Sequence, residues 1–460
     1  MGTKQASWNK KLLFLLLMVC LTGMQSLPPQ EEKNNTSIQI FYSGNIIGYL
    51  ESCGCGGKQD GGLAKWATFI KKNTQSSPIN LILDSGYFIS NQQDIKELKT
   101  EYVVKAMSEI GYDAINLSER DISQIGKNPL ISLKQKYNLP FVSSNIFCLE
   151  SMKLLTTPYI IKSFRQSNNK EIKIGIFGLA RQINLEKEGL IIKNPTTVAK
   201  EVVEELRNKC EFIIALTQLT KEDSLLLAKD VHGIDIIICS GKFSFTDEER
   251  LTKVDQGIIA QPDSKKTKAT SFKLYLNDEG KISSFEEKYA PLDDKIPFDE
   301  KIVKIIDEYK GKIKDKESSE PKTRVVQKIY VGTNECGQCH QKQYKKWQKS
   351  RHSKAFYSLK KAKEEKNPAC LKCHTTGYRQ DNGFWDTETT PDFINVGCEE
   401  CHRLRIGHVM LHKTPLIDEK TIITADKPGK VNSSGICMKC HTVDKDTKFD
   451  FEKDKKKIVH

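Results

Sequence analysis

The chain has 460 residues, of which 38% are hydrophobic and 28% are charged. This composition is sufficient for two or three buried cores and excludes a chain that is disordered as a whole. The formal net charge of +13 is carried mostly by lysine and favours acidic partners or anionic surfaces. The sequence contains no nucleic-acid-binding motif, so we expect no nucleic-acid partner.

The N-terminus has the pattern of an export signal. Lys4, Lys10 and Lys11 precede an apolar run of ten residues from Leu12 to Leu21. Such a run is short for a membrane span but typical of the core of a signal peptide. We therefore predict a signal peptide over residues 1–26 and an exported protein, in the periplasm or at the outer face of the cytoplasmic membrane. The alternative is an uncleaved segment that anchors the chain to the membrane.

Short apolar runs alternate with amphipathic stretches from residue 37 to 315, which predicts an α/β domain. The predicted strands are Ile38–Tyr42, Ile79–Leu83, Ala114–Leu117, Phe141–Ser144, Ile172–Phe177, Phe212–Leu216 and Ile234–Cys239. The predicted helices are Gly62–Lys72, Asp94–Ile110, Thr197–Lys209, Lys221–Lys229 and Asp299–Glu320. Residues Thr270–Tyr289 read as a hairpin. A linker over 316–325 then leads to a second domain, 326–460.

Eight of the 14 cysteines form four copies of one pattern, Cys-x-x-Cys-His. The four copies are Cys336–Cys339–His340, Cys370–Cys373–His374, Cys398–Cys401–His402 and Cys437–Cys440–His441. This is the attachment pattern of haem c, in which two thiols add across the vinyl groups and the adjacent histidine binds the iron. A zinc site would not require a histidine after each cysteine pair. We predict four covalently bound haem c groups, whose macrocycles replace much of a side-chain core among short helices and loops.

The sequence around these motifs resembles the tetrahaem cytochromes c of the nitrifier hydroxylamine-oxidation pathway. The similar segments are Tyr330–His340, Tyr344–Trp347, Ser350–Phe356, Cys373–Tyr378, Gly397–His402 and the ending from Cys440 to His460. The resemblance implies that His352, His408 and His460 are distal iron ligands and that one haem of the four is five-coordinate. The chain departs from the family at Arg403-Leu404-Arg405, which makes His412 a competitor of His408.

The first domain resembles the metallophosphatase domain of 5′-nucleotidases. The similar segments are Phe41–Leu50, Gly61–Ala64, Leu83–Gly86, Gly111–Leu117, Ser143–Asn145, Ile174–Leu179 and Gly233–Ile237. The resemblance implies an α/β metallophosphatase-like sandwich, followed here by a small, mostly α and loop-rich multihaem cytochrome c domain. Most metal ligands of the family are replaced, at Asn45, Ile47, Tyr87, Glu119, Arg120, Asp121, Gln218, Gly241 and Lys242. We therefore expect no two-metal phosphoester hydrolysis and a docking role for this domain.

The loop after the first strand carries two cysteines, Cys53 and Cys55, among glycines. Two thiols one residue apart in such a loop are suited to binding a soft metal or to forming a reducible disulfide. Ordinary loop cysteines are the alternative interpretation, and the sequence leaves the two open.

Two functions are compatible with these features. In the first, the protein is an electron carrier, and the basic stretch Lys342–Lys366 either docks an acidic redox partner or is an ordinary solvated helical face. In the second, it is an oxidoreductase that acts on a small nitrogen or oxygen species at one five-coordinate haem, with the other haems as a relay. We favour the carrier, because most irons have a candidate second histidine.

Overall fold

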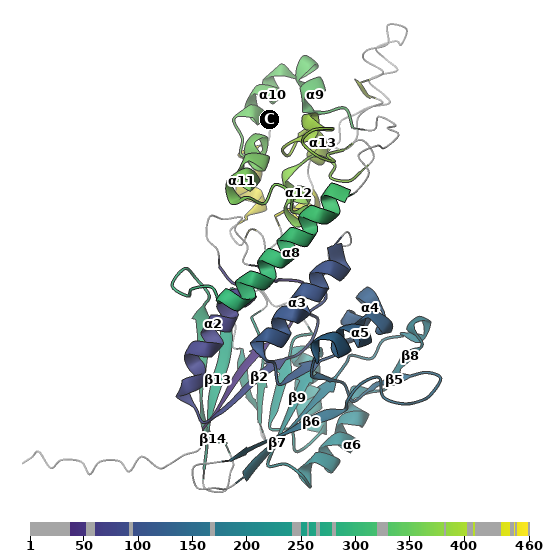
Figure 1. Ribbon diagram of the computed structural model, residues 1–460, viewed down its shortest axis with the longest axis vertical. Helices are drawn as coiled ribbons and strands as arrows, with labels where there is room; N and C mark the ends of the chain where they lie inside the picture. The colour runs from purple at the N-terminus through teal and green to yellow at the C-terminus, as the bar shows by residue number, and fades with distance from the viewer. Residues whose placement is uncertain are drawn as a thin grey trace, which may run out of the picture.

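The computed structural model describes residues 37–51, 60–91, 95–165, 171–241, 250–254, 257–263, 267–277, 282–319, 330–380, 383–402, 408–409, 434–441, 446 and 449–458. Its N-terminal part is a sandwich of two six-stranded sheets, and its C-terminal part consists of short helices. A long helix, α8 (Glu300–Ser319), runs from the sandwich to the C-terminal part (Figure 1). Among the described helices, none is long and apolar enough to span a bilayer.

Each sheet has a parallel centre. The first sheet has the order β14 (Ile282–Pro291), β13 (Lys268–Leu276), β1 (Ser37–Ser43), β2 (Ile79–Asp84), β3 (Ala114–Asn116), β4 (Phe141–Val142). The second has the order β11 (Leu251–Val254), β12 (Gly257–Ala260), β10 (Ile236–Cys239), β9 (Phe212–Thr217), β7 (Glu171–Leu179), β6 (Tyr159–Arg165). In the first sheet β13 runs antiparallel to both β14 and β1, and in the second sheet the edge strands β11 and β6 are antiparallel to their neighbours. A small ribbon pairs β5 (Ile146–Cys148) with β8 (Leu190–Ile192).

Helices cover the outer faces of both sheets. They are α2 (Leu63–Asn73), α3 (Lys96–Ile110), α4 (Glu119–Ile125), α5 (Lys127–Tyr137), α6 (Pro195–Arg207) and α7 (Lys221–Asp230), together with α8. One core lies between the two sheets, a second between the first sheet and α2, α3 and α8, and a third between the second sheet and α6 and α7.

The alternation of side chains along β1 explains these layers. Ile40 and Tyr42 point into the core between the sheets, whereas Phe41 points to the opposite face. There the ring of Phe41 packs edge-on against Trp66 and Phe69 of α2, at centroid distances of 6.4 and 6.1 Å. A strand with both faces buried therefore shows the near-continuous apolar run seen in the sequence.

All seven predicted strands and all five predicted helices are present, with ends that differ by a few residues. The predicted hairpin is β13–β14, which is longer than expected at both ends, and its turn lies outside the described residues. The sequence pattern did not predict the strands β6, β11 and β12 of the second sheet, the strands β5 and β8 of the small ribbon, or the helices α4 and α5. β6 is an edge strand with half-exposed side chains, so its apolar pattern is weak.

The C-terminal part matches the expectation of short helices and loops. Its described helices are α9 (Thr333–Cys339), α10 (Gln341–Gln348), α11 (Ala355–Ala362), α12 (Pro368–His374), α13 (Cys398–His402), α16 (Ser434–Cys437) and α17 (Phe451–Lys455). Among its described residues, one small apolar cluster is formed by the buried side chains of Phe356, Leu359, Leu371 and Phe384. So small a core is consistent with a region whose interior is completed by prosthetic groups.

Candidate functional site

The carboxyl ends of the parallel strands of both sheets meet at one edge of the sandwich, where α/β proteins usually place their sites. Two amide side chains join the sheets there. Nδ2 of Asn45 donates to the carbonyl of Ser240 at 2.6 Å, and Nε2 of Gln218 donates to the carbonyls of Ser85 at 3.1 Å and Gly86 at 3.0 Å. These amide groups thus hold together the loops that follow the strands of the two sheets.

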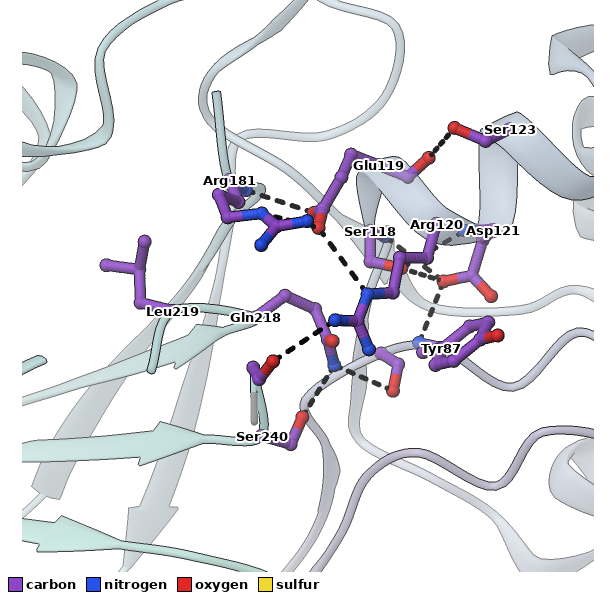
Figure 2. A network of polar contacts seen from close by, with 12 residues as sticks. Tyr87, Ser118, Glu119, Arg120, Asp121, Ser123, Arg181, Gln218, Leu219 and Ser240 are labelled. Carbon is purple, nitrogen blue, oxygen red and sulfur yellow. Dashed lines mark hydrogen bonds and ion pairs between the residues drawn. The ribbon is translucent and has the colours of Figure 1, made fainter. Parts of the chain in front are cut away.

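A guanidinium group lies at the same edge (Figure 2). Arg120, near the start of α4, donates from Nη2 to the carbonyl of Gly241 at 3.1 Å and lies 5.1 Å from the centre of the Tyr87 ring. Glu119 is completely buried between two arginines, with its Oε1 4.0 Å from Nε of Arg120 and 3.5 Å from Nε of Arg181. Burial raises the pKa of Glu119, and both arginines oppose that rise. The guanidinium group of Arg120, held by these contacts, therefore provides positive charge at the carboxyl ends of the strands.

The two remaining acidic residues at this edge, Asp121 and Asp84, accept hydrogen bonds that hold the surrounding loops. Asp121 accepts from the amides of Tyr87 and Phe88 at 2.9 Å each and from Oγ of Ser118, which caps α4. Asp84 accepts from Oγ of Ser43 at 2.6 Å, and burial raises its pKa to about 7. The described residues contain no cluster of three or more His, Cys, Asp or Glu placed to bind a metal ion.

The loops keep an unusual backbone despite these replacements. Ile47 and Tyr87 both have positive φ values, 48° and 64°, which a β-branched or bulky residue rarely adopts. The amide of Ile47 donates to the carbonyl of Tyr87 at 3.0 Å and locks the pair together. The conformation of both loops is therefore held by backbone contacts.

In the C-terminal part, each Cys-x-x-Cys-His motif begins within a short helix. In α12, for example, Cys370, Cys373 and His374 occupy positions i, i+3 and i+4. Those positions share one face of a helix, so both thiols and the imidazole can approach one planar group from the same side. This arrangement fits haem c.

Two pairs of histidine rings face each other in this region. His340 and His408 have ring centroids 5.9 Å apart, and His352 and His441 have centroids 6.0 Å apart. Because an imidazole nitrogen binds a metal at roughly 2 Å and lies roughly 1 Å from its ring centre, two axial rings on one iron have centroids about 6 Å apart. Both observed pairs match the spacing of a bis-histidine iron.

Hydrogen bonds at Nδ1 orient two of the motif histidines. Nδ1 of His441 lies 2.9 Å from Oδ2 of Asp446, and Nδ1 of His374 lies 2.8 Å from the carbonyl of Ala355. A partner at Nδ1 directs Nε2 toward a metal and fixes the ring. Burial, followed by the nearby His441 and His374, lowers the pKa of His352, which favours the neutral ring that ligates.

The motifs also meet in pairs. The thiol of Cys336 contacts that of Cys398, and the thiol of Cys440 contacts that of Cys373. The carboxylate of Glu399 in α13 further accepts from the amides of Val331 and Gly332, at 3.1 and 2.9 Å, just before α9. The first motif therefore lies against the third, and the second lies against the fourth.

Four of the predicted site residues, Cys53, Cys55, His412 and His460, lie outside the described residues. Three further residues contact site residues and were not predicted from the sequence: Arg181, Asp446 and Ala355. A carboxylate a few residues after His441 could have indicated Asp446, but nothing in the sequence marks Arg181 or the Ala355 carbonyl, because tertiary contacts bring them to the site.

Comparisons with known proteins divide the chain in the same way. Residues 335–403 match the family described as cytochrome c554 and c-prime. Cytochrome c-554 of Nitrosomonas europaea is 33% identical over 88 residues, which cover 16% of this chain and 37% of that protein. A snake venom 5′-nucleotidase of Gloydius brevicauda is 28% identical over 209 residues, which cover 43% of this chain and 34% of that protein. The chain thus spans little more than a third of either relative.

Solved structures show the same fold for the sandwich. The 5′-nucleotidase precursor of Thermus thermophilus superposes with a TM-score of 0.52 at 17% identity, over 61% of this chain and 59% of that one. The match to the cytochrome c554 family covers the first three Cys-x-x-Cys-His motifs and implies covalently bound haem c in this region. The chain therefore joins a region with the metallophosphatase fold of 5′-nucleotidases to a C-terminal region that matches the cytochrome c554 family.

Proposed function

We propose that this protein is an exported, periplasmic tetrahaem cytochrome c that transfers electrons and carries a phosphatase-like docking region. The observation that carries the proposal is the set of four Cys-x-x-Cys-His motifs together with two histidine pairs at iron-binding spacing. Bound haem supplies reversible one-electron chemistry, and two histidine ligands favour a low reduction potential. The protein residues hold, orient and enclose these groups.

The histidine pairs support a ligand assignment for two irons. His340 and His408 bind the iron of the first motif, and His441 and His352 bind that of the fourth. His374 and His402 are the proximal ligands of the second and third motifs. His460 and His412 are the remaining candidates for their distal sides.

The phosphatase-like region positions the cytochrome rather than hydrolysing phosphate esters. Asn45, Gln218 and Arg120 use their polar groups to tie the strand ends together, and this supports a scaffold function. Catalysis by two metals requires open coordination sites beside the substrate. Arg120 would repel metal ions at that position.

Redox partners with acidic surfaces are the expected counterparts. In α10 and the following α11, lysines such as Lys345, Lys346 and Lys360 lie on the surface of the region that carries the first motif. Such a charged surface accelerates encounter more than it tightens binding.

The number of candidate distal histidines supports a second candidate function. The family pattern supplies three distal histidines, His352, His408 and His460, for four motifs. An iron without a second ligand binds small molecules, so the protein would then act as an oxidoreductase on a small nitrogen or oxygen species.

Two measurements test these proposals. A pyridine haemochrome assay on the mature protein should give four haems per chain, and the double variant Cys370→Ala/Cys373→Ala should give three. Any other count for the wild type rejects the tetrahaem assignment. A carbon monoxide difference spectrum of the reduced protein then separates the two functions, since binding to one haem in four favours the oxidoreductase and no binding favours the carrier.

A further inference from the structure

A single lysine links the two parts of the molecule. Lys310 projects from α8, and its Nζ lies 2.9 Å from Oε1 of Glu51 and 2.6 Å from Oε1 of Glu364. Glu51 follows the first strand of the sandwich, whereas Glu364 belongs to the cytochrome-like part. Partial burial disfavours the charged form of Lys310, but the two carboxylates outweigh that effect and raise its pKa. Lys310 is therefore a cation held between two anions.

The contact continues to the second haem-attachment motif. Oε2 of Glu364 accepts from Nδ2 of Asn367 at 2.9 Å. Asn367 caps α12, because its Oδ1 accepts from the amide of Ala369 at 3.0 Å. α12 carries Cys370, Cys373 and His374. A continuous set of polar contacts thus runs from Glu51, in the loop after the first strand, to the helix of the second motif.

Tyr309, the residue before Lys310, also supports the close approach of α8 to the two glutamates. Tyr309 is completely buried, and its ring packs against Tyr102 of α3 at a centroid distance of 5.6 Å. Within the described part of the chain, its hydroxyl has no hydrogen-bond partner. Burial raises the pKa of Tyr309, and the charges of Glu51 and Glu364 add to this rise. α8 therefore lies within electrostatic range of both carboxylates that Lys310 joins.

We propose that Glu51, Lys310 and Glu364 dock the phosphatase-like region onto the second haem-attachment helix and set the reduction potential of the haem held there. This inference rests on the proposed function, because it requires a haem at Cys370, Cys373 and His374. The three side chains together carry a net charge of −1. Removing Lys310 leaves two uncompensated carboxylates, which stabilise the oxidised, more positive form of a nearby iron.

The test is a potentiometric titration of the four haems in full-length variants, after the haem content of each has been measured. Lys310→Met should lower one midpoint potential, and Glu364→Gln should raise the same one. His374→Met identifies that midpoint, because it changes an iron ligand of the second haem only. Lys312→Met is the matched control: Lys312 is an exposed lysine on the same helix and should leave all four midpoints unchanged.

The outcomes separate this inference from the proposed function. Wild-type protein without a haem at the second motif would contradict the proposed function itself. With four haems present, unchanged midpoints in Lys310→Met, or a shift of a different haem, would overturn this inference and leave the proposed function in place. If the Lys310→Met variant does not accumulate, the nearly isosteric Glu364→Gln tests the inference instead. The midpoint potential of the second haem should rise in this variant, and a fall or no change would contradict the inference.

Discussion

The imidazole ring of His408 lies nearly parallel to that of His340, with an interplanar angle of 19° and centroids 5.9 Å apart. The departure from the family pattern at Arg403-Leu404-Arg405 comes just before His408 and made His412 a competitor. The observed pair favours His408 as the distal ligand of the first iron.

The first prediction follows from this pair. His408→Ala should open the first iron, so that the fraction of haem that binds carbon monoxide in the reduced protein rises by one haem in four. His232→Ala, at an exposed histidine of the sandwich, is the control and should not change that fraction. No rise with His408→Ala, together with a rise with His412→Ala, would assign the distal position to His412.

The second prediction concerns Asp446, whose carboxylate holds Nδ1 of His441 at 2.9 Å. A carboxylate partner makes the imidazole more electron-rich and stabilises the oxidised iron. Asp446→Asn should therefore raise one midpoint potential, by up to about 60 mV for a tenfold change in relative stability. Spectroelectrochemistry measures the shift. The exposed Glu452 provides the control, since Glu452→Gln also neutralises one carboxylate of the C-terminal segment, and no hydrogen bond to His441 is lost. Equal shifts in both variants would indicate a general charge effect instead.

The sequence predicted the fold of the sandwich well because its strands are buried on both faces. Ile38, Ile40 and Phe41 are all buried, so the apolar run of β1 is almost unbroken. β6 differs, since its side chains are mostly half-buried at a sheet edge and give no clear period. α4 differs for another reason: its start, Glu119-Arg120-Asp121, corresponds to a turn of the phosphatase family whose metal ligands are replaced here, so the resemblance indicates no helix at this point.

The haem motifs could be identified from local spacing, but the pairing of ligands could not. His352 follows the first motif closely in sequence, yet its ring faces His441 of the fourth motif. That pairing depends on how separate segments pack. The sequence also indicated that Arg120 would repel a metal, whereas its contacts with Gly241 and Tyr87 become visible only in the folded chain.

The third prediction uses the buried Asp84, whose pKa is raised to about 7 by burial, against hydrogen bonds from Ser43 and Gly86. In the unfolded chain this pKa is about 3.9. Between these values the folded protein keeps a proton that the unfolded chain has lost, so the contribution of Asp84 to stability falls as the pH rises from about 4 to about 7. The full effect is at most about 4 kcal/mol.

The asparagine in Asp84→Asn cannot ionise, so the variant should lose the decrease in stability with pH that Asp84 causes. Urea unfolding, followed by circular dichroism at about pH 5 and about pH 8, measures it as the difference between wild type and variant. Asp294→Asn changes a carboxylate whose side chain is 73% exposed and should retain the wild-type slope. An unchanged slope in Asp84→Asn would mean that Asp84 is ionised in the folded protein across this range.

The fourth prediction is that Arg120 stabilises the sandwich in place of metal ions. Arg120→Met removes the hydrogen bond to the Gly241 carbonyl and leaves the buried Glu119 with Arg181 as its other arginine. Loss of a charged partner from a buried polar group costs about 1–3 kcal/mol. Urea unfolding should show a decrease of that size, and Arg165→Met, at an exposed position on β6, should change stability by less than about 0.5 kcal/mol. Equal stability of Arg120→Met and wild type would mean that the amide contacts of Asn45 and Gln218 suffice to hold the strand ends together.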